Sequence, residues 1–107
     1  MNLDVAFTPR ALRHLDAIFD YIAEHGDPVV ARNYVRRLEE ACRSLGHLPK
    51  RGVSRDELRP GLRILPFKRS ATIVFSIEKA GVIIHGVFKA GQDYEAIIRE
   101  TPDVGMT

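Results

Sequence analysis

Four cations stand close together in a stretch of the chain that is otherwise apolar. The stretch covers residues 58–75 and reads LRPGLRILPFKRSATIVF, with cations at Arg59, Arg63, Lys68 and Arg69. Cations in this arrangement could hold a phosphodiester in a nuclease site, grip nucleic acid without cutting it, or bind an acidic protein partner. They could also be solvated charges that keep the edge of a sheet from aggregating.

A nuclease needs more than cations. Cleavage of RNA without a metal requires a base for the 2′-hydroxyl, a proton donor for the leaving oxygen and positive charge at the phosphate. Lys89 adds a further cation, and Glu57, His85 and Tyr94 are the plausible acid–base candidates. Nothing in their spacing brings these three residues together, and no row of aromatic residues indicates base stacking. The residue types therefore leave the nuclease and the binding interpretations open.

The charge of the chain is distributed unevenly. Residues 43–69 contain eight Lys or Arg residues against Asp56 and Glu57, a net charge of +6. Because the whole chain carries +2, the remainder carries −4. Such asymmetry is typical of a basic face that meets nucleic acid or an acidic protein segment, although a solvated loop gives the same pattern.

No metal or cofactor motif is present in the sequence. The four histidines are scattered without an HxxxH pair, and there is no CxxC or P-loop pattern. The single cysteine, Cys42, falls on the apolar side of a predicted helix, which indicates a buried thiol and fits a reducing cytoplasm. Residues 1–7 lack a signal-peptide pattern, and no apolar run reaches the length of a membrane span. We therefore expect a cytoplasmic protein without a cofactor or a metal.

Two amphipathic helices are predicted in the first half of the chain. Thr8-Pro9 and Asp27-Pro28 each join an N-cap residue to a proline suited to the first helical position, and Gly26 and Gly46 are placed to end the helices. We expect the two apolar stripes to face the core. They are Leu12, Leu15, Ile18, Phe19 and Ile22, and Val30, Tyr34, Leu38, Ala41, Cys42 and Leu45. The short connection predicts an antiparallel helical hairpin.

Strands are predicted before and after this hairpin. The segments with strand patterns are residues 2–7, 62–66, 71–77 and 82–88. A tight turn at residues 78–81, with Gly81 at positive φ, joins the last two. Residues 46–60 form a polar connector, and DYEAIIRE (93–100) predicts one or two helical turns before a flexible tail over about 100–107.

The order of these elements predicts the fold class. It is β-α-α-β-β-β(-α), an α+β fold in which an antiparallel helical hairpin packs on one face of a mainly antiparallel sheet. We expect residues 1–107 to form a single domain.

In their order and spacing, these segments resemble the ParE toxins of the ParE/RelE superfamily, the toxic halves of bacterial type II toxin–antitoxin modules. The resemblance covers about residues 7–99. It rests on four segments: TPRALRHLDAIFDYIAEHGDPVVARNYVRRLEEACRSL, LPKRGVSRDELRPGLRILPF, SATIVFSIEKAGVIIHGVF and AGQDYEAII. It implies the same β-α-α-β-β-β fold that the pattern predicts.

The resemblance also implies a function. ParE toxins bind DNA gyrase and stall it with DNA cleaved, and they act through protein–protein interaction rather than as enzymes. RelE-type relatives instead cut mRNA in the ribosomal A site, with basic residues on the sheet and an acid–base residue near the C-terminus. The segment FKAGQDYEAIIRE lacks the basic–aromatic ending of such nucleases, and only Lys89 and Tyr94 stand in for it. We therefore expect a gyrase inhibitor, with a ribosome-dependent mRNA endonuclease as the alternative.

A cognate antitoxin is implied as well. Its acidic C-terminal segment would wrap the toxin, with a helix laid beside the helical hairpin and a strand added to the sheet. We assign no catalytic residue and expect six residues to contact the antitoxin or gyrase: Arg59, Arg63, Lys68, Arg69, Lys89 and Tyr94.

Overall fold

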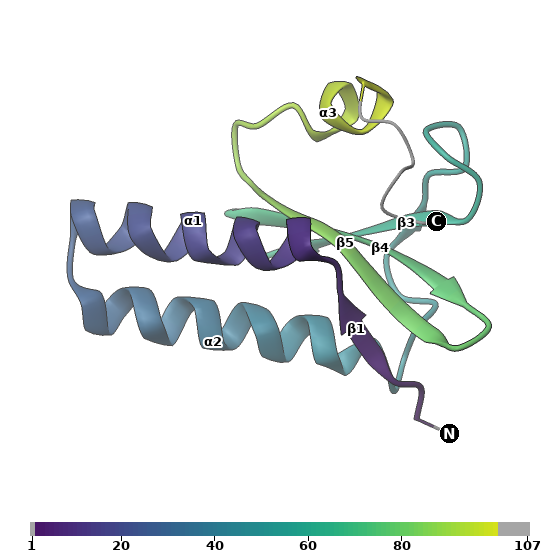
Figure 1. Cartoon of the computed structure of the whole chain (residues 1–107), viewed down its shortest axis with the longest axis horizontal. Helices are drawn as coiled ribbons and strands as arrows, with labels where there is room; N and C mark the ends of the chain where they lie inside the picture. Colours follow the sequence, from purple (N-terminus) through teal and green to yellow (C-terminus); the bar gives the residue numbers. More distant parts are fainter. Residues whose placement is uncertain (1, 101–107) are drawn as a thin grey trace.

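A computed structural model describes residues 2–100 of the chain, which contain three helices and five strands (Figure 1). The helices are α1 (Pro9–His25), α2 (Pro28–Ser44) and α3 (Tyr94–Glu100). The strands are β1 (Val5–Phe7), β2 (Val53–Ser54), β3 (Leu62–Phe67), β4 (Ala71–Glu78) and β5 (Gly81–Lys89). The predicted tail lies outside the described residues, except for Glu100, which ends α3.

The five strands form one sheet in the order β1-β5-β4-β3-β2. β1 pairs with β5 in parallel, and the other three pairings are antiparallel. The predicted α+β fold with a mainly antiparallel sheet is thus confirmed. One strand was not predicted: the two-residue β2 forms inside the polar connector, where Val53 pairs with Ile64. So short a strand leaves no periodicity for a sequence pattern to detect.

The helical hairpin begins at the predicted caps. The Thr8 hydroxyl accepts a hydrogen bond from the Ala11 N–H (3.1 Å), and the Asp27 carboxylate accepts one from the Val29 N–H (2.7 Å). Gly26 ends α1 with φ −162°, which lies outside the left-handed region that glycine often supplies. α1 and α2 lie side by side and antiparallel, as Figure 1 shows.

The main core lies between this hairpin and one face of the sheet. Leu15, Ile18, Leu38 and Cys42 of the helices pack with a buried set from the strands. That set includes Ala71, Ile73, Phe75, Val82, Ile84 and Val87.

Two predicted core positions were wrong. Leu12 is 51% exposed and Val30 is 56% exposed, while the alanines beside them, Ala11 and Ala31, are fully buried. Successive residues differ by about 100° around a helix, so the side chain next to a buried alanine turns toward solvent. The small residue marks the closest approach to the core at each of these helix starts.

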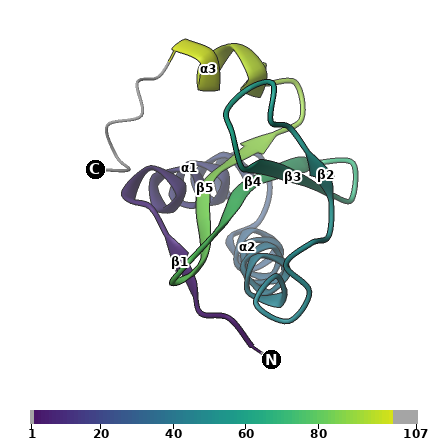
Figure 2. The same ribbon diagram turned by 90° about the vertical axis from the view of Figure 1, so that its right-hand side faces the viewer.

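A smaller core lies on the opposite face of the sheet. Val74 points there, between Ile73 and Phe75 of the main core, and packs with three other buried side chains. These are Leu62, Phe88 and Ile98, the last of them from α3. In Figure 2, α3 and α2 lie on opposite sides of β4 and β5. The sheet is thus covered by the helical hairpin on one face and by α3 on the other.

The turn between β4 and β5 has the predicted glycine at positive φ. Gly81 has φ +144°, and a Cβ built on it would lie 2.4 Å from the Asp4 carbonyl oxygen. That oxygen accepts a hydrogen bond from the Val82 N–H at 2.8 Å. Glycine is therefore required both for the turn and for the close approach of the segment that leads into β1.

Candidate functional site

The cations expected to bind a partner fall into two groups. Lys68 and Arg69 form the turn between β3 and β4, and Lys89 pairs with Ala71 at the start of β4. The N–H of Ala90 donates to the Ser70 carbonyl (2.8 Å), which holds the end of β5 beside this turn. We call Lys68, Arg69 and Lys89 the turn group.

A second group lies at the other end of β3. Arg55 and Arg59 are in the connector, and Arg63 is the second residue of β3; these three form the connector group. Arg63 precedes Lys68 by five residues, or roughly 16 Å along an extended strand. The six predicted residues therefore do not share one patch: three form the turn group, while Arg59, Arg63 and Tyr94 lie with the connector.

The turn group projects from a well-anchored turn. Ser70 shares a 2.6 Å hydrogen bond between its hydroxyl and the Tyr34 hydroxyl, which ties the turn to α2. Lys68 has a positive φ of 53°, and its Nζ lies 5.5 Å from the centre of the Phe67 ring. Lys68 and Arg69 are both exposed. A rigid backbone that presents two exposed cations is suited to binding an acidic surface.

Lys89 is held differently from its two neighbours. Its Nζ lies 3.7 Å from the centre of the Tyr21 ring on α1, a cation–π contact. Tyr21 in turn stacks on His25 at 4.1 Å between ring centres. The Lys89 ammonium is thus drawn toward the far end of α1 rather than toward the sheet.

Arg63 and Arg59 bind backbone carbonyls of this chain. The Arg63 guanidinium donates to the carbonyls of Lys50 (2.8 Å), Arg51 (3.4 Å) and Gly52 (3.4 Å). Arg59 donates to the Ile98 carbonyl (3.2 Å) in the last turn of α3. These two side chains therefore hold the connector and α3 in place, a role that the sequence pattern does not reveal.

Arg55 is the centre of the second group, and the sequence analysis did not identify it as a site residue. It forms ion pairs with Glu57 and Glu95 and donates to the Tyr94 hydroxyl at 2.6 Å. The hydrogen bonds to Glu95 and Glu57 raise the pKa of Arg55, and the bond from Arg55 lowers the pKa of Glu57. Tyr94, a predicted partner-binding residue, is thus part of a contact that fastens α3 to the connector.

The three acid–base candidates fall into two separate networks. Glu57 and Tyr94 both bind Arg55, whereas His85 is buried and shares a 2.8 Å hydrogen bond with Ser76. The Ser76 hydroxyl donates its one proton to Glu78 (2.6 Å), so His85 must donate to Ser76 from Nε2. In a catalytic serine site the histidine accepts the hydroxyl proton, so this Ser–His–Glu chain runs in the wrong direction for a nucleophile.

The described residues form neither a metal site nor a reactive thiol. No three His, Cys, Asp or Glu side chains among residues 2–100 gather as metal ligands. Cys42 is buried, and burial followed by the charge of Glu39 raises the pKa of its thiol to about 12. No helix within residues 2–100 combines the length and the apolar character needed to cross a membrane.

The fold and these surfaces define a class: a small α+β protein with a helical hairpin on a mainly antiparallel sheet and cations at both ends of β3. The sequence profile of the ParE toxin of the type II toxin–antitoxin system, parDE, matches residues 5–94. The chain belongs to this family of toxins.

Solved structures show the same fold. A structure described as the chromosomal ParDE TA system from P. aeruginosa superposes with a TM-score of 0.72 at 24% sequence identity. The match covers 81% of this chain and 95% of the other. No curated protein sequence matches the chain.

Proposed function

We propose that this protein is a cytoplasmic toxin that inhibits DNA gyrase by protein–protein interaction and is neutralised by a cognate antitoxin. The observation that carries the proposal is the match of the ParE toxin profile over residues 5–94. ParE toxins, as a family, stall gyrase with its DNA cleaved. Inhibition of this kind requires a binding surface and no catalytic group on the toxin.

The side-chain contacts support binding rather than RNA cleavage. Glu57 and Tyr94 are both hydrogen-bonded to Arg55, and His85 donates to Ser76. A general acid and a general base must reach the same phosphodiester from opposite sides. Glu57 and Tyr94 instead share Arg55 in the contact that fastens α3 to the connector, and His85 belongs to a second network with Ser76.

The turn group supports a site for an acidic partner. Lys68 and Arg69 are exposed on a turn that Tyr34 anchors to α2. An antitoxin segment that is acidic where it wraps would complement this surface and would be guided to it at low ionic strength.

The edge of the sheet at β2 supports strand addition by the antitoxin. β2 is the outermost strand and has only two residues. Val53 of β2 is 58% exposed and Leu48 before it is 61% exposed, and Lys50 and Arg51 lie between them in the chain. Exposed apolar and basic residues at this edge suit an extended peptide with alternating apolar and acidic residues.

Expression of the toxin without its antitoxin tests the proposal in cells. Inhibition of gyrase predicts filamentation and an SOS response, and co-expression of the antitoxin should restore growth. A RelE-like endonuclease would instead stop translation rapidly and leave mRNA cut on ribosomes, which would exclude the gyrase mechanism.

A further inference from the structure

The outer edge of β5 is exposed beyond the point where β1 ends. The pairing of β1 with β5 stops at Phe7 and Ile84, and in the described chain no strand covers β5 after that residue. Side chains satisfy the backbone groups there. The His85 carbonyl accepts from Thr8 (3.2 Å) and Arg10 (3.3 Å). Two outward N–H groups of β5 remain to be satisfied, at Val87 and Lys89.

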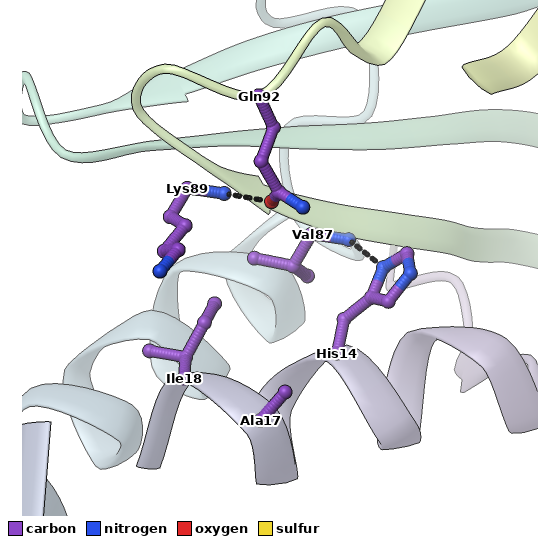
Figure 3. Close-up of a pocket in the computed structure, with 6 residues that line it drawn as sticks. All are labelled: His14, Ala17, Ile18, Val87, Lys89 and Gln92. Atoms are coloured by element: carbon purple, nitrogen blue, oxygen red, sulfur yellow. Dashed lines mark hydrogen bonds between the residues drawn. The ribbon is translucent and has the colours of Figure 1, made fainter. Parts of the chain in front are cut away.

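Two polar side chains accept from these N–H groups. The Val87 N–H donates to His14 Nδ1 (3.1 Å), and the Lys89 N–H donates to the Gln92 side-chain oxygen (2.9 Å). Figure 3 shows both bonds beside a cavity between α1 and β5. The cavity has a volume of about 90 Å³ and is lined by His14, Ala17, Ile18, Val87, Lys89 and Gln92.

These two bonds determine which polar side-chain groups remain available in the cavity. With Nδ1 of His14 accepting, the neutral ring carries its proton on Nε2 and can only donate there. With its oxygen bound to the Lys89 N–H, the Gln92 amide retains its NH₂ group, which Figure 3 shows directed away from Lys89. Lys89 contributes only donors. Every uncommitted side-chain group on the cavity wall is therefore a donor.

Lys89 carries the one formal charge on the cavity wall, because no carboxylate lines it. The ion pairs among residues 2–100 involve Arg55, so Lys89 has no acidic partner there, and its ammonium lies 3.7 Å from the centre of the Tyr21 ring. Burial, followed by the charges of Arg10 and Arg13, lowers the pKa of His14 and disfavours its protonated form. A cavity with a cation, further donors and no acceptor selects a negatively charged group.

The lining of the cavity favours a carboxylate on a short aliphatic chain. One side is apolar, formed by Ala17, Ile18 and Val87. A carboxylate on a short aliphatic chain matches both parts, because its methylenes can lie on the apolar side while its oxygens face the donors.

We propose that the cavity between α1 and β5 binds one carboxylate group, with Lys89 and Gln92 as its principal donors. The carboxylate can belong to a free small molecule or to an aspartate or glutamate side chain of a polypeptide. Only the second source rests on the proposed antitoxin binding. The site itself is tested on the toxin alone, so it can fail or succeed independently of the gyrase proposal.

The first experiment is an NMR titration of the ¹⁵N-labelled protein with propionate at constant ionic strength, with propionamide as the neutral control. We expect saturable shifts of the Val87 and Lys89 amides and of the Gln92 side-chain amide with propionate only. Lys89→Gln should weaken this binding about tenfold or more, as loss of a charge-assisted bond predicts. The control Lys79→Gln removes an equal charge from the β4–β5 turn, at the opposite end of β5, and should leave it unchanged.

A second experiment supplies the carboxylate from the protein. Ala17 lines the cavity and is exposed, so Ala17→Glu can place a carboxylate in it, and Ala17→Gln is the matched neutral control. We expect Ala17→Glu to melt at a higher temperature than Ala17→Gln, and this difference to disappear in the Lys89→Gln background. The background comparison removes any contribution from neighbours of position 17 on α1, such as Arg13.

The source of the carboxylate is tested by competition. A hexaglutamate peptide that displaces propionate, where hexaglutamine does not, identifies a polypeptide side chain as a ligand. Propionate binding without displacement identifies a free small carboxylate. The proposal is overturned if propionate and propionamide cause the same shifts, or if the melting difference between the two position-17 variants persists without Lys89.

Discussion

The Nδ1 atom of His14 accepts a hydrogen bond from the Val87 N–H across 3.1 Å, and this bond joins α1 to the uncovered edge of β5. It can form only while Nδ1 is unprotonated. Burial, followed by the charges of Arg10 and Arg13, lowers the pKa of His14. The bond and the pKa shift both favour the neutral ring, so they connect the packing of α1 to pH.

The first prediction concerns the pH dependence of stability. Because the native pKa of His14 is lowered, the unfolded chain binds more protons near and below the ordinary histidine pKa of about 6.5. The free energy of unfolding should therefore fall as pH drops through this window. Denaturant titrations at several pH values measure the slope, and His14→Phe should reduce it. Equal slopes for the two proteins would contradict the assignment.

The second prediction concerns the attachment of α3. Arg55→Met removes the ion pairs to Glu57 and Glu95 and the bond to Tyr94 while keeping most of the side-chain length. Hydrogen exchange at the amides of α3 should become faster, with little change in β4. Arg32→Met, at an exposed position on α2, is the control and should leave α3 unchanged. Unaltered exchange in the Arg55 variant would show that Ile98 packing and the Arg59 bond to the Ile98 carbonyl hold the helix without Arg55.

The third prediction concerns the thiol of Cys42. Its pKa is raised to about 12 and its side chain is fully buried, so the reactive thiolate is scarce at neutral pH. A thiol-specific disulfide reagent should label the native protein only at the rate of its unfolding, and should label it rapidly in denaturant. Fast labelling of the native protein would contradict the buried position.

The fourth prediction concerns the turn group. Lys68→Glu with Arg69→Glu should weaken binding of an acidic antitoxin by about tenfold at low salt and by less at high salt, since exposed charges are screened. Calorimetric titration at two salt concentrations measures this. Arg32→Glu with Lys79→Glu gives the same change in net charge elsewhere on the surface. If the two double variants bind equally well, the turn group is solvated surface rather than an interface.

Local signals in the sequence predicted most of the fold. Thr8-Pro9 and Asp27-Pro28 set the helix starts because a capping side chain and a proline act within one turn of the chain. The apolar runs located β3, β4 and β5 to within one residue at each end. Leu12 and Val30 were misplaced because apolar character alone does not show whether the alanine or the larger residue next to it is buried.

The candidate site was less predictable because its contacts join distant residues. Arg55 meets Tyr94 and Glu95 across about forty residues of sequence, and no spacing rule relates positions so far apart. The same holds for His14 and Val87, which are brought together because β1 ends before β5 does. Charge density located the basic segment, but it could not separate cations that bind this chain's own carbonyls from those that face solvent.

We propose that the protein acts on gyrase by binding, and cleavage assays with purified components test this proposal. Purified toxin, gyrase, ATP and supercoiled plasmid should yield linear DNA after detergent and protease treatment, with equimolar antitoxin suppressing it. Toxin incubated instead with translating ribosomes should leave the mRNA intact. Unchanged gyrase activity together with mRNA cut in the ribosomal A site would contradict the claim.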